Sequence, residues 1–177
     1  MEQYIPSCFF VCFVIIYKDN KKQEIFMKFI VLADNRVGDN TCLNEDGFAL
    51  YIELDNNTFL FDTGETDLFI KNAEKLNIDL NKVSTVILSH GHHDHANGLK
   101  DLTGGKKVIL HPGCFCNRYS PRRNMEHAGM NQTEEEITNR FDLIKTKEPY
   151  EVCENVYFFW VRYQEKLNLK KYLLKQY

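Results

Sequence analysis

Four side chains able to bind a metal ion lie close together in the middle of the sequence. They are His90, His92, Asp94 and His95, in the order His-x-His-x-Asp-His. In this spacing the first two imidazoles can turn toward one metal ion, while the carboxylate and the third imidazole face a second ion. Imidazole and carboxylate ligands together suit Zn²⁺ and also Fe²⁺ or Mn²⁺, so ligand type alone does not select the metal.

This ligand set predicts hydrolytic chemistry. A catalytic metal site keeps a coordination position for water, and two ions about 3.5–4 Å apart can share a hydroxide nucleophile and hold the oxygens of the reacting group. The alternative is a His-rich surface loop that chelates metal adventitiously. The order of residue types, the apolar segment 83–88 before the motif and the small-residue segment 96–99 after it favour a built site.

The segments around the motif predict an alternation of strands and helices. Apolar runs bounded by turn residues predict strands, and helical spacing after Thr66 or Asp67 predicts an amphipathic helix carrying Leu68, Phe69, Ala73 and Leu76. The strands are predicted over 29–32, 48–54, 58–61, 83–88, 107–110 and 156–159. The motif therefore begins at a strand end, where ligand groups of α/β folds commonly emerge.

Weaker signals concern the region after the motif. Residues 99–102 predict a short helix, and Thr133 with Glu136 forms the capping-box pattern of another helix start. Residues 112–132 are polar and contain Gly, Pro and Arg, so they predict a long loop. Loops of this length often act as lids over functional sites.

Composition places the chain among globular proteins with one domain as the default, because 44% of its 177 residues are hydrophobic. A net charge of −3 provides no basic surface for nucleic acid or an anionic membrane, so the predicted partner is a small-molecule substrate. The apolar run 5–17 is too short to span a bilayer. Six scattered cysteines favour a reducing, cytoplasmic location. No feature indicates the oligomeric state.

Together these segments resemble the metallo-β-lactamase superfamily, whose signature is this motif at a strand end. The resemblance covers residues 27–159 and extends to a subgroup similar to ribofuranosylaminobenzene 5′-phosphate synthase-like proteins. It is carried by the segments 31–35 (VLADN), 47–48 (GF), 60–64 (LFDTG), 72–73 (NA), 78–80 (IDL) and 111–112 (HP). The implied fold class is α/β, a metallo-β-lactamase αββα sandwich, represented here by about its N-terminal half.

The resemblance also implies roles for individual residues. His90 and His92 would bind the first ion, and Asp94 and His95 the second, with two Zn²⁺ in an intact site and Asp94 counted as catalytic. Asp62 would be a carboxylate that orients a ligand histidine; its alternative role is that of a turn residue before a glycine. His93, between the ligands, is expected to point away from the metals.

Two further histidines remain. His111 is expected at the mouth of the pocket, where it could meet substrate. With Cys114 and Cys116 it could instead form a soft-metal site, the less favoured interpretation. His127 is expected to be solvated.

The sequence departs from the family in its second half. Family members supply further ligands there, namely a histidine to the first metal, and a bridging aspartate and a last histidine to the second. This sequence has no histidine after His127. We therefore expect a metal-dependent hydrolase that is weak or inactive in this truncated form, with an exposed inner sheet face prone to aggregation. The alternative is a non-catalytic metal-binding fragment or assembly module.

Three segments are predicted along the chain. Residues 1–26 form a non-native N-terminal extension, with translation starting at Met27, because the family resemblance begins there and the codons for residues 22–26 can contain a bacterial ribosome-binding sequence. Residues 27–159 form the partial metallo-β-lactamase-fold domain. Residues 160–177 form a non-homologous tail, as a one-base frameshift near codons 158–160 would produce.

Overall fold

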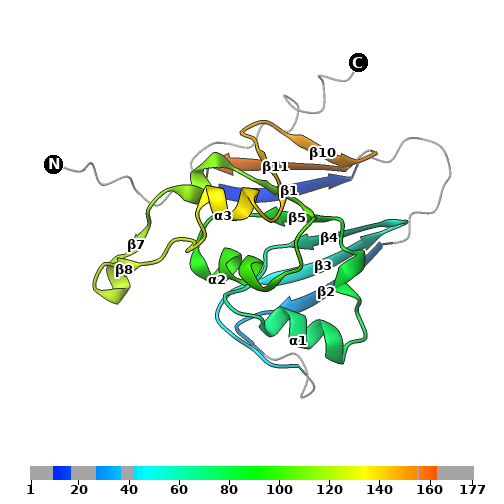
Figure 1. Ribbon diagram of the computed structural model, residues 1–177, viewed down its shortest axis with the longest axis horizontal. Helices are drawn as coiled ribbons and strands as arrows, with labels where there is room; N and C mark the ends of the chain where they lie inside the picture. Colours follow the sequence, from blue (N-terminus) through cyan, green and yellow to red (C-terminus); the bar gives the residue numbers. More distant parts are fainter. Residues whose placement is uncertain (1–9, 17–26, 37–41, 155, 163–177) are drawn as a thin grey trace.

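Figure 1 shows the computed structural model of the protein, which describes residues 10–16, 27–36, 42–154 and 156–162. The strands are β1 (Phe10–Ile16), β2 (Met27–Ala33), β3 (Ala49–Leu54), β4 (Asn57–Phe61), β5 (Thr85–Leu88), β6 (Lys107–Leu110), β7 (Tyr119–Ser120), β8 (Glu126–His127), β9 (Asp142–Lys145), β10 (Tyr150–Cys153) and β11 (Val156–Arg162). The α-helices are α1 (Leu68–Lys75), α2 (His93–Ala96) and α3 (Glu134–Thr138). The 3-10 helices are η1 (Leu80–Lys82), η2 (Asn97–Asp101), η3 (Pro112–Phe115) and η4 (Pro121–Arg123). None of these helices is long and apolar enough to cross a bilayer.

A six-stranded sheet in the order β2-β3-β4-β5-β6-β9 forms the centre of the molecule. β2, β3 and β4 pair antiparallel, with a short turn between β3 and β4, whereas β4, β5, β6 and β9 pair parallel. Parallel neighbours need crossover connections, and α1, α2 with η2, and α3 lie in these crossovers. The carboxyl ends of β4, β5 and β6 therefore meet at one edge of the sheet.

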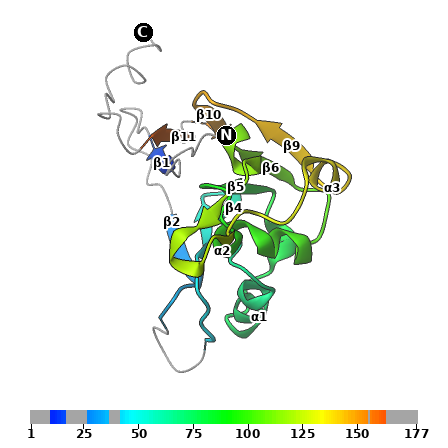
Figure 2. The same ribbon diagram turned by 90° about the vertical axis from the view of Figure 1, so that its left-hand side faces the viewer.

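A three-stranded sheet in the order β1-β11-β10 faces the central sheet on one side. Figure 2 shows β1 and β11 on one side of the central sheet and α1 and α3 on the other. Between the two sheets lies a buried cluster comprising Ile52, Leu54, Phe59, Ile87, Ile109, Val156, Phe158 and Trp160. The layers are those of the predicted sandwich, with a second sheet smaller than the first.

The helices cover the opposite face of the central sheet. Phe69 and Ala73 of α1 are buried there with alternate residues of the strands, such as Leu60, Val86 and Leu88. The predicted helix start is confirmed, because α1 begins directly after Asp67. β5 is buried on both faces, and this explains why all of its residues except Thr85 are apolar.

The capping box predicted for α3 is confirmed: the Thr133 side chain accepts from the Glu136 backbone N–H, and Glu136 reaches back to Thr133. The prediction of one long loop over 112–132 was wrong. That region contains η3, η4 and the β7–β8 hairpin, which projects at the left of Figure 1. Strands of two residues are too short for a periodic signal, so no pattern could have revealed them.

The predicted boundary at 159/160 falls within β11, and the segment predicted to lie outside the domain at the N-terminus contributes β1 to the same second sheet. β1 lies within residues 1–26 and pairs antiparallel with β11 along its whole length. β11 runs on to Arg162, and Trp160 is only 6% exposed. The predicted start at Met27 and the predicted frameshift stay predictions, because neither concerns the folded chain.

The inner face of β2 is exposed. Met27, Phe29 and Val31 are about half exposed, and they pair with residues of β3 that face the second sheet. This stripe is where the described part of the second sheet leaves the central sheet uncovered. It is the feature from which the predicted aggregation would arise.

We expect the Trp160→Ala substitution to lower the free energy of unfolding by about 3–5 kcal/mol, because it leaves a large cavity between the sheets. Trp160→Phe should cost about 1–3 kcal/mol, since the Leu88 carbonyl oxygen loses the indole N–H that now lies 3.0 Å from it. Urea denaturation followed by circular dichroism measures both. Met125→Ala, at an exposed position, is the control. Neutral behaviour of both Trp160 variants would show that β11 does not pack as described.

Candidate metal centre

The candidate residues come from the carboxyl ends of three adjacent parallel strands. Asp62 follows β4, Ser89 and His90 follow β5, and His111 follows β6. The sheet register places these ends side by side. Residues 28 positions apart in the sequence, such as Asp62 and His90, are thereby brought into one site.

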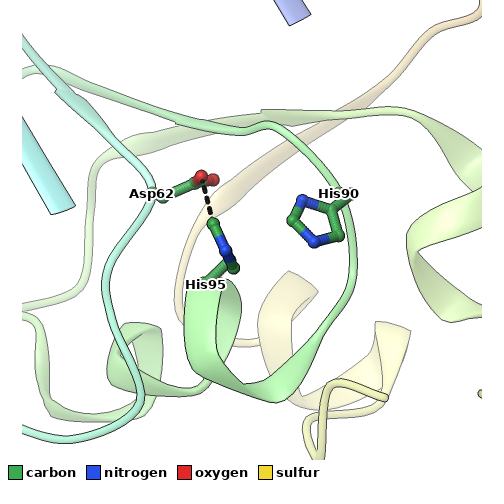
Figure 3. A group of neighbouring side chains, drawn as sticks. All are labelled: Asp62, His90 and His95. Atoms are coloured by element: carbon green, nitrogen blue, oxygen red, sulfur yellow. Dashed lines mark hydrogen bonds and ion pairs between the residues drawn. The ribbon is translucent and has the colours of Figure 1, made fainter. Parts of the chain in front are cut away.

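Asp62 is buried at the centre of this site, with an exposed fraction of 1%. Its Oδ1 accepts the Ser89 backbone N–H at 2.7 Å, and its Oδ2 accepts the Ser89 hydroxyl at 2.6 Å. Oδ2 also lies 2.8 Å from Nδ1 of His95, the contact drawn in Figure 3. The backbone of Asp62 has a φ of 58°, the left-handed region, which Asp tolerates better than most residues.

These contacts define the tautomers of two histidines. A carboxylate only accepts hydrogen bonds, so the Ser89 hydroxyl and Nδ1 of His95 must be the donors. The Ser89 oxygen then accepts from Nδ1 of His90, which lies 2.8 Å away. In the neutral forms, Nε2 of His90 and Nε2 of His95 therefore carry the lone pair that a metal ion requires.

The electrostatics of this group follow from its burial. Burial raises the pKa of Asp62, while its hydrogen bonds with His95 and Ser89 act in the opposite direction. Burial alone would lower the pKa of His95, but the hydrogen bond and charge of Asp62 outweigh it and raise that pKa. A metal ion would thus compete with a proton for Nε2 of His95.

His90 and His92 form a pair whose nitrogens face each other. Nε2 of His90 lies 3.0 Å from Nδ1 of His92. Burial, followed by the charges of neighbouring groups, lowers the pKa of His90 to about 2, and burial with the charge of Arg118 lowers the pKa of His92. Both rings are therefore neutral at neutral pH. Zinc–nitrogen bonds are about 2.0–2.1 Å long, so one ion can reach both nitrogens.

Asp94 and His95 form a second pair on the short helix α2. Oδ2 of Asp94 lies 3.8 Å from Nε2 of His95. The Asp94 carbonyl accepts the Phe48 backbone N–H, and a Cβ on Gly47 would lie only 1.8 Å from that oxygen. Gly47 has a φ of 119°, so both space and backbone conformation require glycine beside the helix. These contacts fix the position of α2 relative to the loop after β2.

Within the described residues, ligand atoms of Asp62, His90 and His95 lie within 4.8 Å of one another. Distance alone would make Asp62 a ligand. Its oxygens, however, already accept three hydrogen bonds, so it is better suited to orient His95 and His90 than to bind an ion. The donor set of three imidazoles and the Asp94 carboxylate fits Zn²⁺, Fe²⁺ or Mn²⁺.

His93 makes contacts of its own rather than joining this group. Its Nδ1 lies 3.2 Å from Oε1 of Glu65, and its Nε2 lies 3.4 Å from Nη1 of Arg123. It therefore links the loop after β4 to the tip of the β7–β8 hairpin, contacts that sequence reasoning did not anticipate.

His111 stands beside the second sheet. Its Nδ1 accepts the Gly113 backbone N–H at 2.9 Å, and its ring centre lies 6.4 Å from that of Trp160. It thus starts the turn η3. Its predicted contact with substrate stays a prediction.

Two residues important to the geometry carried no expected role. Ser89 connects Asp62 to His90, and its position directly before the motif was a signal that could have been read. Arg118 is buried with its guanidinium against the motif backbone, and a single arginine in a polar segment has no sequence pattern to reveal it.

Comparison with known proteins concerns the fold and the segment that carries the motif. Residues 44–112 match the family model described as the metallo-beta-lactamase superfamily. A solved metal-dependent hydrolase of the beta-lactamase superfamily superposes with a TM-score of 0.61 at 31% identity, over 79% of this chain and 56% of that one. The chain has the metallo-β-lactamase fold. The segment that matches the superfamily model, residues 44–112, carries the whole motif.

Two curated relatives come from Methanocaldococcus jannaschii. An uncharacterized protein is 31% identical over 63% of this chain and 44% of its own length. A protein named 7,8-dihydropterin-6-methyl-4-(beta-D-ribofuranosyl)-aminobenzene-5'-phosphate synthase is 25% identical over 82% of this chain and 54% of its own length. The chain thus spans about half the length of the curated relatives it matches.

We predict that Asp62→Asn changes the tautomer of His95. The amide retains one acceptor oxygen. When the Ser89 backbone N–H keeps that oxygen, the amide N–H₂ takes the place of Oδ2, faces Nδ1 of His95 and makes that nitrogen an acceptor. The proton then moves to Nε2. Nitrogen-15 shifts of the imidazoles in metal-free protein report this directly. Asp67→Asn, which removes an exposed carboxylate paired with Lys71, is the control. An unchanged His95 spectrum in Asp62→Asn would refute the orienting role.

A second prediction concerns the alternative soft-metal site. Burial raises the pKa of the Cys114 thiol to about 12, so at pH 8 this thiol is protonated and enclosed. We expect iodoacetamide at pH 8 to alkylate the exposed Cys116 in the native protein and to spare Cys114 until urea unfolds it. Peptide mass spectrometry measures both. Equal native reactivity would restore the alternative of a thiolate site.

Proposed function

We propose that this chain is a metal-dependent hydrolase of the metallo-β-lactamase type that acts on a small-molecule substrate. The observation that carries the proposal is the gathering of imidazole ligand atoms at one strand edge, where Nε2 of His90 lies 3.0 Å from Nδ1 of His92 and ligand atoms of His90 and His95 lie within 4.8 Å of each other. The match to a solved metal-dependent hydrolase supports the same conclusion.

In this proposal His90 and His92 hold the first metal ion, and Asp94 and His95 hold the second. Zn²⁺ is the metal we propose, two per intact site, and Fe²⁺ or Mn²⁺ would suit the same ligands. When bound, such ions supply Lewis acidity and generate a hydroxide nucleophile from water near neutral pH. The scattered cysteines support a reducing, cytoplasmic location.

The residues of the chain perform the remaining tasks. Asp62 and Ser89 hold the rings of His95 and His90 in the tautomers described above. Asp94, whose side chain is 30% exposed, is reachable by water and can accept a proton from an attacking water molecule. Asp94 is therefore the residue to which we assign catalysis.

A non-catalytic metal-binding module is the second candidate. The sequence has no histidine after His127, and the further family ligands would have to come from elsewhere. We therefore propose that this chain by itself hydrolyses substrate weakly or not at all. The relative named as a synthase supports neither candidate, since its name describes a different reaction.

We expect the double substitution of His90 and His92 by Ala to abolish binding of the first ion, because both proposed ligands are removed. Plasma mass spectrometry after dialysis against Zn²⁺ measures the stoichiometry. His127→Ala, at an exposed position in the hairpin, is the matched control and should retain the metal of the unmodified chain. If the double variant also retained it, the assignment of these ligands would be wrong.

The two candidates are separated by turnover. The metal-loaded chain is assayed with p-nitrophenyl acetate and bis(p-nitrophenyl) phosphate, before and after removal of metal by a chelator. Hydrolysis that disappears with the metal and returns on its readdition supports the enzyme. Stoichiometric metal without turnover supports the module.

A further inference from the structure

Arg118 is a buried cation whose partners are backbone carbonyls. Its exposed fraction is 8%, and it lies between η3 and β7. Nη1 donates to the carbonyl oxygens of Gly91, Cys114 and Cys116 at 3.3, 3.1 and 3.0 Å, and Nη2 donates to that of Gly113 at 2.6 Å. Among the ion pairs of the described residues none involves Arg118. Buried charges are normally paired, so this arrangement calls for a reason.

The reason lies in which peptides the guanidinium joins. Gly91 separates His90 from His92, and its carbonyl also accepts the Met130 backbone N–H at 2.9 Å. On the other side of His92, the His93 backbone N–H donates to the Ala128 carbonyl at 3.1 Å. A Cβ on Gly91 would lie 2.0 Å from the Cys114 carbonyl oxygen, so the motif is pressed directly against the η3 turn.

We propose that Arg118 is a positioning residue of the metal centre, whose guanidinium locks the Gly91 peptide against the η3 turn and so fixes the direction in which His92 projects toward His90. The inference rests on the proposed function, since it concerns the same ligands. Arg118 does not belong to the ligand set, and it acts through the backbone of the motif.

The charge of Arg118 provides the means to test this role. A positive charge beside the site repels a metal cation, although the four carbonyl dipoles offset part of it. If Coulomb repulsion dominated, removing Arg118 would strengthen metal binding. If positioning dominates, removing it weakens binding, because His92 loses its fixed direction. The sign of the change therefore separates the two effects.

The guanidinium group is needed for its shape. It presents five N–H donors in a rigid plane and can reach four oxygens that belong to two segments. A lysine at position 118 would keep the charge but supply a compact ammonium group, which cannot span the same set. Arg118→Lys thus separates the charge from the geometry.

We would measure Co²⁺ affinity by competition with a chelator, together with the visible absorption spectrum of bound Co²⁺. Arg118→Met and Arg118→Lys should each weaken binding by about tenfold or more, as loss of supporting contacts does at other metal sites. Lys106→Met is the matched control. Lys106 is 7% exposed, and its Nζ donates to the carbonyls of Leu80, Asn81 and Val83, away from the motif. That variant should lose stability without a change in Co²⁺ affinity or spectrum.

Hydrogen exchange in the metal-free protein provides a second readout. The backbone amides of His93 and Met130, which bond to the hairpin and to Gly91, should exchange faster in Arg118→Met and remain protected in Lys106→Met. Tighter Co²⁺ binding by Arg118→Met, full affinity in Arg118→Lys, or unchanged exchange would overturn the inference. If the unmodified chain takes up no Co²⁺, the proposed function fails, and the exchange comparison then decides the positioning role by itself.

Discussion

The buried carboxylate of Asp62 is the interaction on which the site depends. One side chain without exposure to water accepts a backbone N–H, a hydroxyl and an imidazole N–H. A buried carboxylate is tolerated only when its oxygens are satisfied in this way. The requirement works in both directions, because the same three bonds hold Ser89 and His95 in place. The end of β4 is thereby joined to the segment after β5.

The strands of the central sheet fix the position of this junction. Asp62 and His90 follow neighbouring parallel strands whose register is set by apolar residues buried on both faces. Thr63 adds two hydrogen bonds, because its backbone N–H and its hydroxyl both donate to the His95 carbonyl, at 2.8 and 3.2 Å. A helix of four residues such as α2 has little stability of its own, so these contacts determine where Asp94 and His95 point.

The site is also braced from two more distant parts of the chain. On one side the hairpin and η3 are joined to the motif through Arg118. On the other side the second sheet packs beneath β5, where Trp160 donates its indole N–H to the Leu88 carbonyl. Leu88 lies two residues before His90, so β11 supports the strand from which the motif emerges. The proposed metal centre is therefore linked to both layers of the sandwich.

The sequence by itself determined the strands of the central sheet other than β9, the helix after Asp67, the capping box at Thr133 and the identity of the candidate ligands. Each depends on local spacing, on apolar periodicity or on residue type, which a sequence displays directly. Only the tertiary structure decided that Ser89 joins Asp62 to His90, that His93 contacts Glu65 and Arg123, and that Arg118 closes on Gly91. Those contacts join segments far apart in the chain. The partner of Arg118 is a backbone carbonyl, which every residue carries, so no pattern of side chains could reveal which carbonyl it would meet.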